Sequence, residues 1–166
     1  MIGASIGSWM CVSFQSGLSW ITVLKKRENF REAFHQFDWD KMANYGHRDI
    51  TRLISNKGII RNKRKIEAVI HNAKMMQELI ALEGSLAHFV WRFEPKNHIA
   101  PSSLRATTAE SIALASEFKD RGWRFLGPTT VYAFMQAMGI VNDHFSNCYR
   151  RQELLNLRYE NTDTSF

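Results

Sequence analysis

The sequence contains only two cysteines, Cys11 and Cys148, and no charged residue before Lys25. Two cysteines cannot build a disulfide framework, so the chain suits a reducing compartment and a cytoplasmic location is expected. The uncharged start raises the question of a signal peptide or a membrane segment. No basic residue precedes its apolar stretch, however, and serine and glycine interrupt that stretch, which is unlike a secretory signal. Neither export nor membrane insertion is therefore expected.

The composition is that of a folded domain with a basic surface. Apolar residues make up 45% of the 166 residues and charged residues 23%, which is typical of globular proteins. A chain of this length fits one domain over residues 1–166, because a second core would leave neither half enough apolar surface to bury. The 22 Lys and Arg residues exceed the 16 Asp and Glu residues, and the net charge is +6. This balance favours a polyanionic partner such as nucleic acid.

Apolar residues recur at helical spacing along most of the chain, and no sustained strand alternation is present, which predicts an all-α fold. Helices are predicted over 18–37, 38–45, 48–55, 59–80, 86–93, 107–122 and 128–139. The predicted N-terminal caps are Asp38, Ser85 and a capping box of Thr107 with Glu110. The stretch 94–105 contains two prolines and is predicted to be a loop. The tail, residues 150–166, shows little pattern and is expected to be loose.

The segment from Gly122 to Thr130 joins two predicted helices and has glycines at both bends. Gly127 allows another backbone to approach, Pro128 fits the first turn of a helix, and the N–H groups from Thr129 onward would face outward. A turn of this kind can hold a DNA phosphate. An ordinary connection between two helices is the alternative.

His144 and Cys148 lie four residues apart, a spacing that would place an imidazole and a thiolate on one face if this segment is a helix. Structural zinc takes four ligands, so either Cys11 and another histidine complete a site or the pair is an ordinary one. The remaining histidines show no ligand spacing, and we interpret them as structural.

Three other features could contact nucleic acid. Trp20 follows a glycine turn and could stack on an extruded base, although a tryptophan at a helix start more often belongs to a core. The basic groups are Lys25, Lys26 and Arg27 in one stretch and Arg61, Lys63, Arg64 and Lys65 in another. Each group could follow a phosphate backbone or simply form a solvated face.

Four ordered stretches of the sequence closely resemble 3-methyladenine DNA glycosylase I. They are FQSGLSWITVLKKRENF from Phe14, GIIRNKRKIEAVIHNA from Gly58, FVWRF from Phe89, and the run from Gly122 through FLGPTTVYAFMQAMGIVNDH to His144. The resemblance implies a helix-hairpin-helix fold and a monomeric enzyme. It also implies removal of 3-methyladenine from double-stranded DNA in base excision repair, without cutting the strand.

The resemblance also assigns roles to individual residues. Gly127, Pro128 and Thr129 would belong to the DNA-binding hairpin. Gly17 and Leu18 would fill the gap left by the extruded nucleotide, and Trp20 would stack on the flipped base. His144 and Cys148 match two of the family's four zinc ligands. No lysine is positioned like the nucleophile of strand-cutting relatives, which fits plain hydrolysis.

Toward the N-terminus, the resemblance does not extend beyond Phe14. The family's first segment supplies a Cys and a His to zinc, and residues 1–13 do not match it, so half of the zinc site is missing. The family also carries a Glu that hydrogen-bonds the methylated adenine, and the equivalent position here is Val12. A valine cannot accept a hydrogen bond or stabilise a cationic base. No catalytic residue can therefore be assigned, and impaired catalysis is expected.

Three hypotheses follow from this difference between the chain and the family. The chain is a glycosylase with reduced activity, a DNA-binding module that does not catalyse, or the product of a truncated or misread gene whose original start has been replaced. Base release measured beside DNA binding would separate them.

Overall fold

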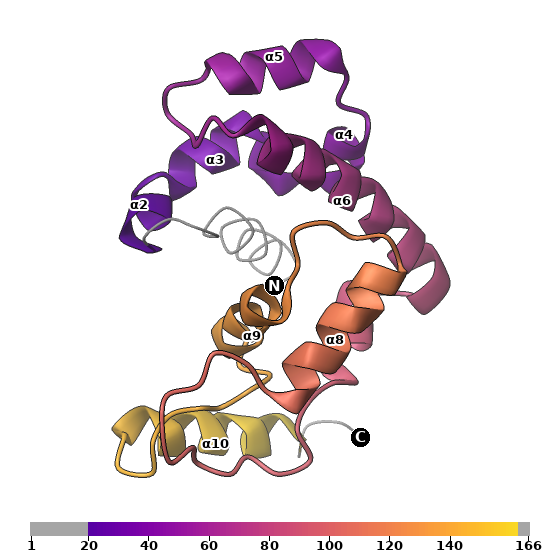
Figure 1. The fold of residues 1–166 in the computed structure, drawn as a ribbon. Helices are drawn as coiled ribbons and strands as arrows, with labels where there is room; N and C mark the ends of the chain where they lie inside the picture. The colour runs from indigo at the N-terminus through magenta and orange to yellow at the C-terminus, as the bar shows by residue number, and fades with distance from the viewer. Residues whose placement is uncertain (1–19, 163–166) are drawn as a thin grey trace.

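The computed structural model describes residues 20–162, with side chains over residues 21–156. The described part of the chain is all helical, as predicted (Figure 1). Its elements are α2 (Trp20–Lys25), α3 (Arg27–Ala33), the 3-10 turn η1 (His35–Phe37), α4 (Trp39–Ala43), α5 (His47–Ser55), α6 (Lys63–Glu83), α7 (Leu86–Trp91), α8 (Ala109–Asp120), α9 (Pro128–Ala137) and α10 (Tyr149–Thr162). None of these helices is long and apolar enough to cross a bilayer.

Side chains cap several of these helices. The side chain of Asp38 accepts a hydrogen bond from the Lys41 N–H at 3.1 Å, and Ser85 accepts one from the His88 N–H at 3.0 Å. Each bond satisfies a backbone donor that the first helical turn leaves without a partner. Both predicted caps are confirmed. The capping box before α8 lies one residue later than predicted and pairs Thr108 with Ser111.

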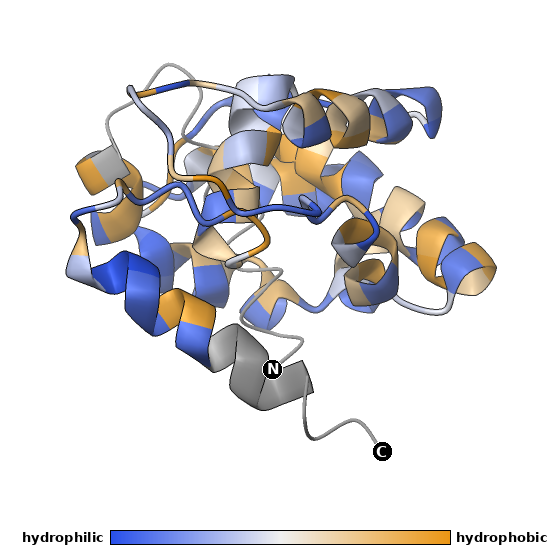
Figure 2. Cartoon of the chain, turned by 90° about the horizontal axis from the view of Figure 1, so that it is seen from below, coloured by the Kyte–Doolittle hydropathy of each residue, from blue (hydrophilic) through white to orange (hydrophobic). Residues whose placement is uncertain are grey.

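The long helix α6 is the centre of the fold, as its periodicity predicted. Its first half contributes Ile66, Val69 and Ile70 to a buried cluster with α3, α4 and α5. Its second half contributes Met76 and Leu79 to another cluster with α7, α8 and α9. Apolar and polar residues are interspersed along the helices (Figure 2), and the buried residues of α6 recur at helical spacing, so that this helix buries one side. One helix therefore belongs to both cores.

The predicted helix over residues 18–37 is interrupted twice. The first break is at Lys26, whose ammonium donates to the carbonyl oxygens of Lys57 at 3.3 Å and Gly58 at 3.0 Å. The second is η1, where His35, Gln36 and Phe37 have φ values of 49°, 59° and 62°. A left-handed residue other than glycine costs about 1–2 kcal/mol. Burial of the Phe37 ring, which is 4% exposed, offsets part of that cost.

From Tyr149 to Thr162 the chain forms α10, a helix that the sequence pattern did not indicate. Arg151 at its start ties it to the preceding loop. The Arg151 guanidinium donates to the carbonyl oxygens of Asn142 and His144, each at 3.0 Å, and to that of His98. Hydrogen bonds from a side chain to loop carbonyl oxygens leave no signature in the local sequence.

Candidate nucleic-acid interface

The turn between α8 and α9 is built by a glycine-terminated helix end. Gly122 has φ 80°, a conformation that glycine adopts at no steric cost. Its N–H bonds the Lys119 carbonyl and the Trp123 N–H bonds the Phe118 carbonyl, both at 2.9 Å. The rings of Phe118 and Trp123 then pack 4.9 Å apart. These bonds and this apolar contact make a Schellman motif, which sets the direction in which the hairpin leaves α8.

The start of α9 presents backbone N–H groups on an exposed surface. Gly127 caps the helix and Pro128 occupies its first turn, and both residues are exposed together with Thr129. Gly127 has φ −75°, so its backbone does not require glycine. Nothing lies within 4 Å of where its Cβ would be, and the site is open to a partner. The structure thus brings the three predicted hairpin residues together at the positive end of a helix dipole.

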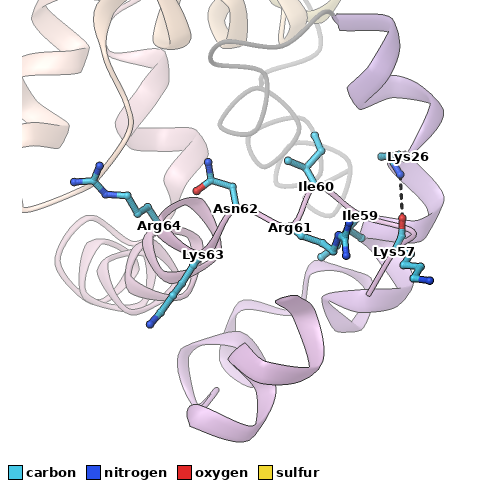
Figure 3. A pocket seen from close by; sticks show the side chains of 8 residues that line it. All are labelled: Lys26, Lys57, Ile59, Ile60, Arg61, Asn62, Lys63 and Arg64. Atoms are coloured by element: carbon cyan, nitrogen blue, oxygen red, sulfur yellow. Dashed lines mark hydrogen bonds between the residues drawn. The ribbon is translucent and has the colours of Figure 1, made fainter. Parts of the chain in front are cut away.

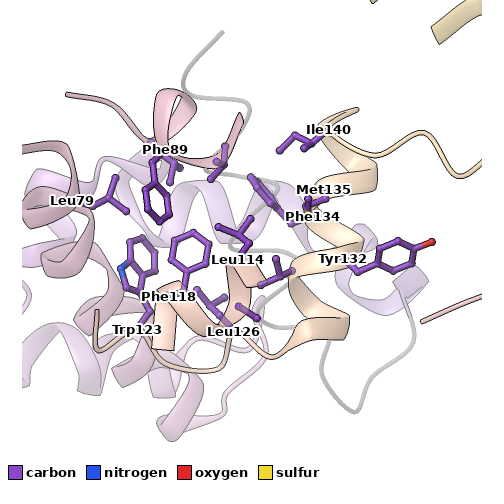
Figure 4. Packing of buried hydrophobic residues seen from close by; sticks show 14 of the residues in the cluster. Leu79, Phe89, Leu114, Phe118, Trp123, Leu126, Tyr132, Phe134, Met135 and Ile140 are labelled. Atoms are coloured by element: carbon purple, nitrogen blue, oxygen red, sulfur yellow. The ribbon is translucent and has the colours of Figure 1, made fainter. Parts of the chain in front are cut away.

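Residues buried under the hairpin hold it in place. Trp123 and Leu126 are 7% and 8% exposed and belong to the second core cluster, while Arg124 and Phe125 between them are exposed. Figure 4 shows Trp123 and Leu126 packed with Phe118 and Leu114. The hairpin therefore alternates between side chains that anchor it and side chains that face outward.

A shallow groove with basic walls lies at the start of α6. It is lined by Lys26, Lys57, Ile59, Ile60, Arg61, Asn62, Lys63 and Arg64 (Figure 3). The basic side chains of this set come from α2–α3, the loop before α6 and the first turn of α6, so the fold collects charges that are far apart in sequence. Lys65, which the sequence placed in the same basic group, is only 7% exposed. Burial lowers the pKa of its ammonium, and Lys65 does not line the groove.

The structure brings the predicted metal ligands His144 and Cys148 together, although they lie in the loop before α10 and not on a helix. The Nδ1 atom of His144 lies 3.4 Å from the Sγ atom of Cys148. Two ligands of one tetrahedral zinc ion, at about 2.1 Å and 2.3 Å from the metal, would be roughly 3.6 Å apart. The pair therefore fits one half of a zinc site. Among the described side chains, no group of three His, Cys, Asp or Glu residues is placed to hold a metal.

Asp143, beside this pair, is a buried carboxylate that sequence reasoning did not single out. Its side chain is 4% exposed and pairs with Arg105 from the 94–108 loop. The Arg105 Nε donates to Asp143 Oδ2 at 2.7 Å, and the hydroxyl of Tyr132 on α9 also donates to this oxygen. Burial raises the pKa of Asp143, but the hydrogen bonds from Arg105 and Tyr132 outweigh it, and the pKa lies below its usual value. Burial and the carboxylate raise the pKa of Tyr132 to about 12.

We expect the stabilising effect of Asp143 to depend on pH. Because its pKa is lower in the folded chain, its contribution is complete above the unfolded value of about 3.9 and is lost as the pH falls through the folded value. Asp143→Asn should lower the free energy of unfolding by about 1–3 kcal/mol at pH 7. Urea unfolding at a series of pH values should show that difference shrinking below about pH 4.

A matched control for this prediction is Asp120→Asn, because Asp120 is an exposed carboxylate at the end of α8. Its free energy of unfolding should stay within about 0.5 kcal/mol of the parent at every pH. A difference between Asp143→Asn and the parent that stays constant down to pH 2 would contradict the assignment.

The other predicted site residues lie at or beyond the edge of the described structure. Trp20 begins α2, but its side chain is outside the described residues. Gly17 and Leu18 lie outside them altogether, as do Val12 and Cys11. Their proposed roles in base flipping and base recognition stay predictions.

Comparison with known proteins gives consistent matches. A family model described as methyladenine glycosylase matches residues 9–151. The DNA-3-methyladenine glycosylase of Haemophilus influenzae is 45% identical over 139 residues, which cover 81% of this chain and 75% of the relative. DNA-3-methyladenine glycosylase 1 of Escherichia coli is 46% identical over 142 residues, covering 81% and 74%.

Solved structures agree with these matches. A crystal structure of 3-methyladenine DNA glycosylase I superposes with a TM-score of 0.80 at 43% identity and covers 89% of this chain and 84% of the other. A variant of 3-methyladenine DNA glycosylase I in complex with 3-methyladenine superposes with a TM-score of 0.82 at 31% identity, covering 89% and 82%.

Proposed function

This chain belongs to the methyladenine glycosylase family and is a monofunctional DNA glycosylase, and we propose that it releases 3-methyladenine from double-stranded DNA in base excision repair. The observation that carries the proposal is the family match over residues 9–151, which includes an exposed hairpin suited to a phosphate. We further propose that the chain acts as a monomer in the cytoplasm, where its two cysteines would stay reduced.

The proposed reaction needs the damaged base outside the duplex. A methylated adenine is cheaper to unstack than an intact one, and a pocket can inspect it only after extrusion. In this scheme the hairpin at Gly127, Pro128 and Thr129 holds a phosphate of the damaged strand, while Leu18 occupies the gap and Trp20 stacks on the base. Because 3-methyladenine is cationic, it is a good leaving group and needs little acid catalysis. Water then completes hydrolysis of the N-glycosidic bond.

This function is tested by measuring base release and binding side by side. The purified chain is incubated with duplex DNA containing 3-methyladenine, released base is quantified, and binding is measured on a duplex with a non-hydrolysable analogue. Release above the spontaneous rate supports the enzyme. Binding without release would instead support the alternative of a DNA-binding module that does not catalyse, in which Val12 stands in place of the family's glutamate. A chain that neither binds nor releases would overturn the proposal.

We also propose that the zinc site of the family is incomplete in this chain. His144 and Cys148 supply two ligands, whereas a structural zinc ion takes four. The test is the metal content of the purified protein, which should be well below one zinc per chain. A stoichiometric content that falls in His144→Ala would show that further residues, such as Cys11, complete the site.

The basic groove is expected to contact the DNA backbone. Arg61→Ala with Arg64→Ala should raise the Kd for undamaged duplex DNA about tenfold, since two phosphate contacts are lost. The slope of log Kobs against log salt concentration should become shallower by about 1.8. Fluorescence anisotropy at several salt concentrations measures both quantities.

The matched control is Arg48→Ala with Lys96→Ala, which removes the same charge from exposed residues outside the groove. If this control weakens binding and flattens the slope as much as the groove variant does, the effect belongs to net charge and not to the groove.

A further inference from the structure

One side chain of α6 bonds both backbone groups of a hairpin residue. The side-chain amide of Asn72 donates to the Arg124 carbonyl oxygen, and its Oδ1 accepts from the Arg124 N–H, both at 2.9 Å. Asn72 is 9% exposed, and both bonds are partly buried. On the same turn of α6, the Nε2 of His71 lies 2.9 Å from the Gly122 carbonyl oxygen. Adjacent residues of the central helix thus hold two successive parts of the hairpin.

This pairing fixes the hairpin more closely than packing would. An amide that accepts from the N–H and donates to the C=O of one residue acts like a neighbouring strand and sets both the position and the orientation of that peptide. The next residue, Phe125, has φ 59° and is 45% exposed. A left-handed aromatic residue on the surface is unfavourable by itself and persists only where the surroundings determine the backbone. The two bonds from Asn72 fix the backbone of Arg124, the residue immediately before Phe125.

The same helix also carries part of the basic groove. Lys63 and Arg64 in the first turn of α6 line the groove, and Asn72 lies eight residues further along. At a rise of 1.5 Å per residue this is about 12 Å along the helix. A rigid link between the two surfaces would let them engage one backbone together.

We infer that Asn72 is a positioning residue for DNA binding: it fixes the hairpin relative to the basic groove, so that both contact the same DNA at once. The inference rests on the proposed function and adds a residue that touches no DNA itself. Asn72 acts only through the Arg124 backbone and the hairpin that follows it.

The test is Asn72→Ala in the full chain, with DNA binding measured at several salt concentrations. We expect the Kd for duplex DNA to rise about tenfold, because the hairpin no longer meets its phosphate. The slope of log Kobs against log salt concentration should become shallower by about 0.9, the contribution of one phosphate contact. The circular dichroism spectrum should be unchanged. His71→Ala, which removes only the single bond to Gly122, should show a smaller change in the same direction.

The control is Ile66→Val, which removes a buried methylene on α6 within the first core cluster and should leave Kd and salt slope unchanged. If Asn72→Ala binds DNA like the parent with the parent's salt slope, Asn72 merely packs the hairpin and the inference fails while the proposed function stands. If the parent itself does not bind DNA, both fail together. An Asn72→Ala variant that does not fold is replaced by Asn72→Ser, judged by the same two readouts.

Discussion

Replacing Val12 by glutamate is expected to raise the rate of 3-methyladenine release by about 100-fold, the size of effect that one well-placed electrostatic group has on a reaction rate. The family that this chain resembles carries a glutamate at the equivalent position, where its carboxylate hydrogen-bonds the methylated base. A carboxylate attracts a cationic purine and favours its extrusion into the pocket, whereas the valine side chain can do neither. Single-turnover release from duplex DNA containing 3-methyladenine measures the change.

Two controls accompany this prediction. Val12→Gln can accept a hydrogen bond but carries no charge, so its rate should lie between those of the parent and Val12→Glu. Binding to undamaged duplex DNA should be similar in all three, because that binding depends on phosphate contacts elsewhere. A Val12→Glu rate equal to that of the parent would show that the position does not face the base.

Phe118→Ala is expected to lower the free energy of unfolding by about 3–5 kcal/mol, which is a large share of the roughly 5–15 kcal/mol that holds a domain folded. Phe118 is 0% exposed. Its ring centroid lies 5.4 Å from that of Phe89 and 4.9 Å from that of Trp123, so truncation leaves a cavity between α7, α8 and the hairpin (Figure 4). Urea unfolding followed by tryptophan fluorescence measures the loss.

Ile112→Ala on the same helix is the control, because Ile112 is 52% exposed and its truncation should change stability by less than about 0.5 kcal/mol. Since Trp123 belongs to the hairpin, Phe118→Ala should also weaken DNA binding in the fraction that stays folded. A Phe118→Ala variant as stable as Ile112→Ala would contradict the packing described for the second core.

Local signals predicted most of the helices. The caps at Asp38 and Ser85 and the helix end at Gly122 depend on residues within one turn of the chain, and the sequence displays them directly. The turn at residues 35–37 could not be predicted in this way, because Phe37 is drawn into a left-handed conformation by a core that distant residues build. Helix α10 is similar, since Arg151 binds loop carbonyl oxygens that the local pattern does not reveal.

In the candidate site, too, the features that depend on local sequence were predicted and those that depend on distant contacts were not. Gly127 and Pro128 were found because glycine and proline have strong positional preferences at a helix start. The contact of Asn72 with Arg124 joins residues 52 positions apart, so the sequence offered only an asparagine on the predicted core helix. Lys65 was misplaced because three exposed basic neighbours suggested a fourth, while helical periodicity turns this residue inward.

Because α6 belongs to both cores, it affects how the chain unfolds. If either cluster loosens, the half of α6 that it covers loses its apolar contacts, and a helix is only as stable as its tertiary packing. The two halves are therefore expected to unfold cooperatively, in one transition. The amide protons between Ile66 and Leu79 would then exchange with solvent only through global opening, while those of α10 would exchange by local fraying. A destabilising change in the cluster that carries the hairpin should therefore also destabilise the cluster next to the groove.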